Sequence, residues 1–339
     1  MKVQLHEAPE IIETYIRAKL VPFIKGSPGI GKSDIVRQIA QKFGLLVIDL
    51  RLAQCDPVDL NGFPMIDPKT GKGYYAPMST FPLEGDAIPA GYNGWLLFLD
   101  ELNSAPTSVQ AAAYKVVLDR MVGQHHLHKN VAIVAAGNLD SDNAITNEMS
   151  SALKSRLVHL EVECNAEKWA EWASSCGFSE RVVSFINSAN HRLFTFDPKS
   201  SDDTYACPRT WAFVNRLVPL VPPNEMSVAL YAGAIGEGVA REFIAHCALE
   251  AHVPKLQDIL ANPKLIRVPD DPSILWILCS TFSRAIKSSN VAAMMDFVIR
   301  MPLEFQVVML RQANLKTQPE LLKEASMIEW IKNNGNELF

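Results

Sequence analysis

The sequence lacks the usual marks of a cross-linked, metal-bound or membrane-embedded chain. Its six cysteines are too far apart for a Cys-x-x-Cys pair, so neither a zinc site nor a disulfide framework is expected. Reduced thiols fit a cytoplasmic location. The first residues have neither the basic nor the apolar segment of a signal peptide. No apolar run approaches the roughly 18–20 residues that a spanning helix needs, so no membrane insertion is expected.

Charge of one sign is not concentrated in any part of the chain. The sequence has 32 Lys and Arg against 37 Asp and Glu, a net charge of -5, and no run of like charge stands out. Sequence-independent binding to nucleic acid is therefore not expected. The 339 residues are 48% hydrophobic and 20% charged, which excludes a disordered chain and fits a globular protein of about two domains.

Short apolar runs alternate with helical patterns over the first half of the chain. Strands are expected at 20–25, 45–48, 95–99, 131–136 and 157–162, with helices between them. This alternation predicts a largely parallel sheet covered on both faces. Only helical patterns follow Glu163. We therefore expect an α/β nucleotide-binding domain at 1–162, a helical domain at 163–254 and a C-terminal helical region at 255–339. A cluster of prolines marks the boundary between the two helical parts.

A phosphate-binding loop occupies the turn between the first long strand and the helix after it. Its eight residues match G-x-x-x-x-G-K-[ST] at every fixed position: Gly26, Ser27, Pro28, Gly29, Ile30, Gly31, Lys32 and Ser33. Glycines let successive N–H groups point at phosphate oxygens, and the helix N-terminus favours negative charge. Lys32 is expected to reach the β and γ phosphates, and Ser33 to hold Mg²⁺. The alternative is a chance glycine turn before a helix.

Two carboxylates follow the apolar strand at 95–99. We expect Asp100 to hold Mg²⁺ through water and Glu101 to polarise an attacking water. The alternative is a buried strand whose end is merely solvated. A second acid after the Mg²⁺ ligand favours hydrolysis over binding alone. No N-K-x-D stretch for reading guanine is present, so ATP is the expected nucleotide.

With these motifs the sequence resembles the AAA+ ATPases, and more narrowly the MoxR-like group of the helix-2-insert clade, with its dynein-related type of AAA domain. The segment 100–106 with Val109-Gln110 is similar to that group's D-E-[IL]-N-x-A-P-x-x-[VL]-Q. The stretch Asp59-Leu60-Asn61-Gly62 is similar to the one that leads into the group's inserted hairpin, expected here near 59–79. The resemblance covers residues 20 to about 218. It implies an α/β P-loop AAA+ module followed by an α-helical lid and further C-terminal helices.

The resemblance also implies roles for three residues outside these motifs. Asn138 matches sensor 1, whose amide orients the attacking water, although an Asn here could instead cap a turn. Arg156 matches the arginine finger, which acts in the neighbouring subunit's site. An isolated arginine is more often a surface charge, and Lys154 is close enough to be confused with the finger. Arg209 matches the sensor 2 arginine at the start of a lid helix. The group commonly has Ser where this chain has Cys207.

The resemblance implies a Mg²⁺-dependent ATP hydrolase that works as a homo-oligomeric ring, a hexamer, with ATP between subunits. Hydrolysis would move the lid through Arg209 and the interface through Arg156, and would remodel a protein partner. MoxR-like proteins commonly pair with a von Willebrand factor A domain protein and activate a client complex as chaperones. Two alternatives stay open: a DNA-directed AAA+ motor or loader, and a nucleotide-switched scaffold with little turnover. The negative net charge counts against the first.

Three further patterns have a plain structural interpretation. The stretch 125–128 contains three histidines but no Cys or carboxylate at ligand spacing, so a polar loop is expected rather than a metal site. In the resembling group it corresponds to a hairpin facing the ring's channel. The insert aromatics Phe63, Tyr74 and Tyr75 either pack locally or contact a partner. Four methionines are expected in a helical core rather than on a binding surface: Met294, Met295, Met301 and Met309.

Overall fold

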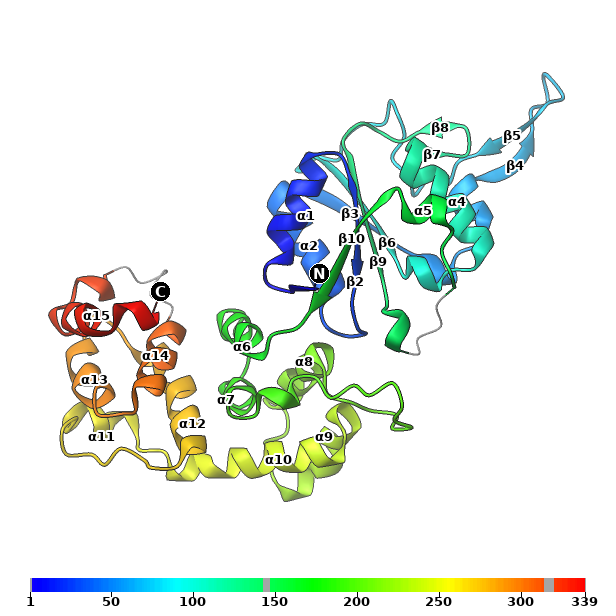
Figure 1. Ribbon diagram of the computed structural model, residues 1–339. Helices are drawn as coiled ribbons and strands as arrows, with labels where there is room; N and C mark the ends of the chain where they lie inside the picture. The colour runs from blue at the N-terminus through cyan, green and yellow to red at the C-terminus, as the bar shows by residue number, and fades with distance from the viewer. Residues whose placement is uncertain (1, 143–146, 314–319, 339) are drawn as a thin grey trace. The chain divides into compact units, whose positions relative to one another are not determined.

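The computed structural model describes residues 2–142, 147–313 and 320–338 of the chain. The chain divides into two compact units, which we call unit 1 (residues 1–165 with 197–200) and unit 2 (residues 166–196 with 201–339) (Figure 1). Unit 1 is an α/β domain. The described part of unit 2 consists of helices and their connections, without a strand.

Unit 1 is organised around one six-stranded sheet in the spatial order β1-β10-β2-β9-β6-β3. Every neighbouring pair in it is parallel, which confirms the sequence prediction. The strands are β1 Lys2–Gln4, β2 Val21–Lys25, β3 Leu45–Arg51, β6 Gly94–Asp100, β9 Val131–Gly137 and β10 Leu157–Glu163. The edge strand β1 was not predicted, because three residues are too few to show a period.

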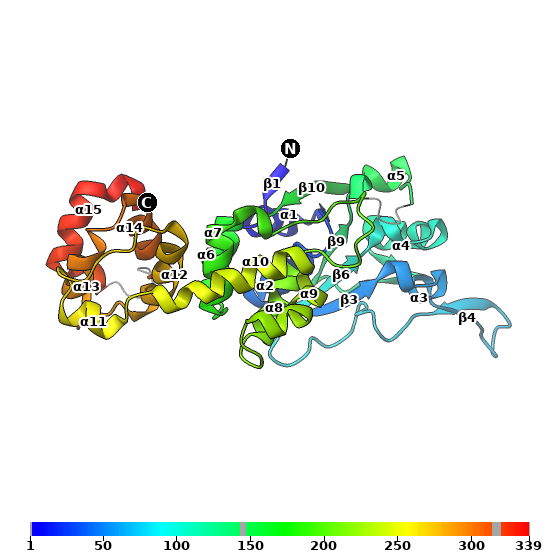
Figure 2. The ribbon, with the colours of Figure 1, turned by 90° about the horizontal axis from the view of Figure 1, so that it is seen from below.

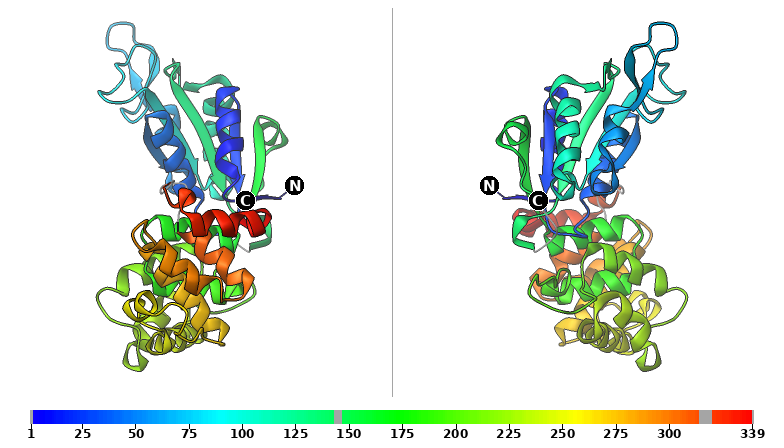
Figure 3. Two further views of the ribbon diagram at one scale, coloured as in Figure 1. Left: turned by 90° about the vertical axis from the view of Figure 1, so that its left-hand side faces the viewer. Right: turned by 90° about the vertical axis from the view of Figure 1, so that its right-hand side faces the viewer.

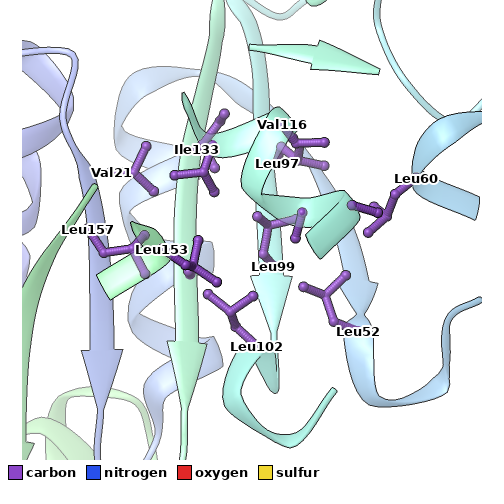
Figure 4. Close-up of a cluster of buried hydrophobic side chains, with 14 of the residues drawn as sticks. Val21, Leu52, Leu60, Leu97, Leu99, Leu102, Val116, Ile133, Leu153 and Leu157 are labelled. Carbon is purple, nitrogen blue, oxygen red and sulfur yellow. The ribbon is translucent and has the colours of Figure 1, made fainter. Parts of the chain in front are cut away.

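Helices cover both faces of this sheet (Figures 1 and 3). One face carries α1 Ala8–Arg17 and α2 Lys32–Phe43; the other carries α3 Pro57–Asn61, α4 Thr107–Asp119 and α5 Ser151–Lys154. Because both faces are covered, β6 is buried along its whole apolar run, with Leu96 to Leu99 at most 1% exposed. Leu97 and Leu99 pack with Val116 of α4 in the core under the second face (Figure 4).

Two small antiparallel hairpins extend from unit 1. The longer pairs β4 Phe63–Ile66 with β5 Gly73–Ala76 and projects away from the sheet (Figures 1 and 2). The shorter pairs β7 Met121–Val122 with β8 His125–His126. The prediction of a polar loop at 125–128 is therefore wrong in part, because Gly123 at φ +56° turns the backbone so that Val122 pairs with His125. The described residues contain no cluster of possible metal ligands.

Unit 2 contains ten α-helices within its described residues. They are α6 Ala166–Ser175, α7 Glu180–Ser188, α8 Pro208–Leu217, α9 Val228–Ile235, α10 Glu237–Ala248, α11 Leu256–Ala261, α12 Pro272–Phe282, α13 Val291–Val298, α14 Leu303–Gln312 and α15 Ala325–Leu338. The four methionines named above are at most 3% exposed, so the prediction of a helical core is confirmed. None of the described helices combines the length and apolarity that crossing a membrane requires.

Candidate nucleotide-binding site

The loop from Gly26 to Ser33 joins β2 to α2 and has the backbone shape of an anion cradle. Gly29 and Gly31 have φ of +78° and +110°, in the left-handed region that favours glycine. A Cβ at Gly26 would come within 2.5 Å of the Ile30 Cδ1, so the turn closes tightly over a buried Ile30. Within the described residues, the N–H groups of Gly29, Ile30 and Gly31 donate to no backbone carbonyl. Such N–H groups at a helix N-terminus suit phosphate oxygens.

The ammonium of Lys32 lies inside this loop, and the residue is only 9% exposed. Its Nζ donates to the carbonyl oxygens of Gly26 at 2.5 Å and Ser27 at 3.1 Å, and to Oδ1 of Asn138 at 3.2 Å. A phosphate placed here would gain charge-assisted hydrogen bonds from this ammonium.

The strand order brings the remaining polar residues to the same edge of the sheet. β9 lies between β2 and β6, and Lys25 is in register with Gly137 while Leu99 is in register with Ala135. The carboxyl ends of these parallel strands therefore meet beside the loop. Ligands bind at such an edge in open parallel sheets, where the chain crosses from one side of a central strand to the other.

Ser33 and Asp100 face each other across this edge. The Ser33 hydroxyl donates to Oδ2 of Asp100 at 3.4 Å, and the other carboxylate oxygen accepts the N–H of Glu101 at 2.9 Å. A hydroxyl and a carboxylate are hard oxygen donors, so the pair fits Mg²⁺ bound together with phosphate oxygens and water. Glu101 follows β6 directly and has φ +56°, an unfavourable conformation for a residue with a Cβ.

Asn138 follows β9 directly, and its backbone is held by the side chain of Asn103. Asn103 Nδ2 donates to the Asn138 carbonyl oxygen at 2.8 Å, and the Asn138 N–H donates back to Asn103 Oδ1 at 3.1 Å. The Asn138 side chain meanwhile faces Lys32. Sequence reasoning gave Asn103 no role beyond the family segment in which it lies, because nothing in spacing reports a bond between residues 35 positions apart.

Arg156 lies on the exposed segment after α5. Its Nη1 donates to Ser155 Oγ at 2.7 Å and to the Ala152 carbonyl oxygen at 3.1 Å, and its guanidinium lies 5.5 Å from the Tyr114 ring centroid. In the described part of the chain it makes no hydrogen bond to the phosphate-binding loop. Lys154 makes a 3.5 Å ion pair with Glu148.

Arg209 is the second residue of α8 and belongs to unit 2. It is exposed, and its place relative to the loop stays a prediction. The helix start is well formed: Pro208 occupies the first position and the Thr210 hydroxyl accepts the N–H of Cys207 at 2.8 Å. Cys at this position is therefore compatible with a regular helix start.

Comparison with known proteins adds likenesses in fold alone. No family model matches the chain, and no curated protein matches it. NtrX from Brucella abortus in complex with ATP aligns over 98% of this chain and 68% of its own, with 14% identity and a TM-score of 0.36. A Cytophaga hutchinsonii protein named as an ATPase aligns over 90% and 80%, with 15% identity and a TM-score of 0.36. A full-length MCM homologue from Methanopyrus kandleri aligns over 46% and 34%, with 14% identity and a TM-score of 0.31.

The chain's own architecture places the site: a phosphate-binding loop follows β2, an acidic pair lies at the end of β6, a polar residue follows β9, and a helical unit comes after the sheet in sequence. This is an α/β P-loop module followed by helices, as the sequence predicted.

Proposed function

We propose that this protein is a Mg²⁺-dependent ATPase that binds ATP at the carboxyl edge of its parallel sheet and hydrolyses it. The observation that carries this proposal is the convergence of residues distant in sequence on one edge. Lys32 bonds Asn138, 106 positions away, and Ser33 bonds Asp100, 67 positions away. A loop that only turned the chain would not need a buried ammonium, a carboxylate and an amide around it.

Each of these residues has a chemical task in the proposed reaction. The loop N–H groups and Lys32 hold the phosphates. Ser33 and Asp100 would hold Mg²⁺, which neutralises phosphate charge when bound. The Asn138 amide orients a water for attack on the γ phosphorus, and Glu101 accepts its proton as the bond to the ADP oxygen breaks. ADP and inorganic phosphate are the products.

We further propose that the protein acts as a ring, a hexamer of the MoxR-like type, with ATP between neighbouring copies. Arg156 supports this, because it is exposed and its contacts lie with α5 and Tyr114 rather than with its own phosphate-binding loop. An arginine offered to a neighbouring copy would stabilise charge on the transferred phosphoryl group. Arg209 would report the nucleotide state to the lid helices.

We propose that the work of this ring is to remodel a protein complex, with a von Willebrand factor A domain protein as partner. The β4–β5 hairpin supports a protein partner, because it exposes five large apolar side chains at 38–71% of their surface: Phe63, Met65, Ile66, Tyr74 and Tyr75. Contiguous apolar surface of this kind is typical of protein interaction sites.

The test is the ATPase rate against protein concentration, with mass determined under the same conditions. Arg156→Ala is compared with Lys154→Ala, a neighbouring exposed cation that serves as the matched control. We expect specific activity to rise with assembly, Arg156→Ala to assemble but lose turnover by a factor of 10³ or more, and Lys154→Ala to stay near wild type. Turnover independent of both concentration and Arg156 would exclude the shared-site ring.

A second experiment separates this proposal from its competitors. Glu101→Gln keeps the shape of the side chain but cannot accept a proton, so we expect it to bind ATP and to lose turnover. A variant that still performed the full biological role would favour a nucleotide-switched scaffold. Binding of the assembled wild-type ring to DNA, with affinity falling steeply as salt rises, would favour a DNA-directed motor.

A further inference from the structure

The side chain of Asn103 is bonded to the backbone of a residue of the candidate site, Asn138. It is 4% exposed, and its amide pairs with both backbone groups of Asn138 at 2.8 and 3.1 Å. This pairing reproduces the reciprocal hydrogen bonds of neighbouring strands. It holds both backbone polar groups of the residue immediately after β9, at the point where the strand ends and the Asn138 side chain faces Lys32.

The backbone of the same turn also bonds the segment that leads toward Arg156. The Asn103 carbonyl oxygen accepts the N–H of Asn147 at 2.6 Å, and Asn147 Nδ2 donates to the Ala105 carbonyl oxygen at 2.9 Å. The turn after the acidic pair is thereby bonded to the end of β9 and to the chain just before α5. The bonds to Asn147 are accepted by backbone carbonyls, so a substitution at position 103 removes only the two side-chain bonds to Asn138.

The Asn103 amide packs closely against the backbone of Gly137, the last residue of β9. A Cβ there would lie 2.2 Å from Asn103 Oδ1 and 2.8 Å from Phe23 Cζ, both below any ordinary contact. The Asn103 amide therefore rests directly against the last residue of β9. A shorter side chain at 103 would leave the Asn138 N–H and carbonyl without their partners.

We propose that Asn103 is a positioning residue for ATP hydrolysis, acting through Asn138. It sets where the Asn138 amide presents itself to the attacking water, because its own amide is bonded to the Asn138 backbone. This inference rests on the proposed ATPase function. A shift of about 1 Å in an orienting group costs on the order of 100-fold in rate, whereas the binding of ATP through the loop and Lys32 does not depend on Asn103.

The test is a double-mutant cycle on the full-length protein with Asn103→Ala, Asn138→Ala and the double variant, measured as kcat and KM for ATP. We expect Asn103→Ala to lower kcat roughly 10- to 100-fold with KM and ATP affinity within about threefold of wild type. The double variant should lose no more than Asn138→Ala alone, because the first change acts through the second residue. Asn93→Ala is the control, since its Nδ2 also donates to a backbone carbonyl, that of Phe43 at 2.9 Å.

Asn103→Asp keeps the shape and one of the two hydrogen bonds, so it replaces Asn103→Ala in the cycle if the alanine variant does not fold. Losses that multiply in the double variant overturn the positioning role while leaving the ATPase proposal in place. So does a raised KM with unchanged kcat. Absence of turnover in wild type refutes the proposed function, and the positioning role falls with it.

Discussion

Replacing Gly137 by alanine should damage both the stability and the turnover of this protein. The added Cβ would meet Asn103 Oδ1 at 2.2 Å, Asn103 Cγ at 2.8 Å and Phe23 Cζ at 2.8 Å. Phe23 is fully buried in the central strand β2 and Asn103 is held at both ends of its amide, so neither can move away cheaply. The substitution must therefore strain the core or displace the amide.

The expected cost has two parts. Inserting a methyl group into a close-packed core costs about 1–3 kcal/mol. Leaving the buried amide without its partners costs a further 1–3 kcal/mol or so. We expect the free energy of unfolding to fall by about 3 kcal/mol, and kcat to fall because Asn138 is displaced along with Asn103.

Urea unfolding at neutral pH, followed by ATPase assays on the folded variant, measures both effects. Gly73→Ala is the matched control, because a Cβ at that strand position would meet nothing closer than the Met65 carbonyl oxygen at 3.9 Å. It should stay within about 0.5 kcal/mol of wild type. If Gly137→Ala unfolds like the control and keeps full turnover, the close packing of Asn103 against β9 is refuted.

Three further changes have expected outcomes. Burial lowers the pKa of His246, which bonds Ser184 Oγ at 3.0 Å, to about 4 from an ordinary 6.5. Between these pH values the folded state binds fewer protons than the unfolded state, so stability is lost as pH falls from 6.5 toward 4. The free energy of unfolding in urea should be about 2 kcal/mol lower at pH 5 than at pH 7, and His246→Gln should remove this difference. Ser33→Ala should raise the Mg²⁺ concentration needed for half-maximal ATPase activity at least tenfold, seen in a Mg²⁺ titration; an unchanged midpoint would exclude the Ser33–Asp100 pair as ligands. Asp271→Ala should cost about 1 kcal/mol in thermal unfolding, because Asp271 Oδ1 accepts the Ser273 N–H at the start of α12; an unchanged transition would contradict its capping role.

The elements that could be predicted were those whose pattern is local. The buried strands and the helix after the phosphate-binding loop were recognisable from apolar periodicity and from the glycine and proline residues that bound them. The start of α12 is equally local, since Asp271 caps the helix and Pro272 follows it at the first helical position. The residues of the edge strand β1 and of the short strand β8 do not by themselves predict a strand, although the family resemblance implies a hairpin at 125–128. Each strand exists through pairing with a distant or closely turned segment rather than through its own composition.

The candidate site shows the same division. The loop at Gly26–Ser33 and the pair Asp100-Glu101 each consist of contiguous residues whose types and spacing indicate their chemistry. The sequence by itself therefore determined that a phosphate-binding loop and an acidic strand end were present. Only the parallel order β2-β9-β6 decided that these meet at one edge. The amide of Asn103 became part of the site in the same way, by bonding to Asn138 across 35 residues. Hydrogen bonds of this kind depend on register and strand order, which a linear pattern does not contain, whereas backbone turns and side-chain chemistry are properties of neighbouring residues.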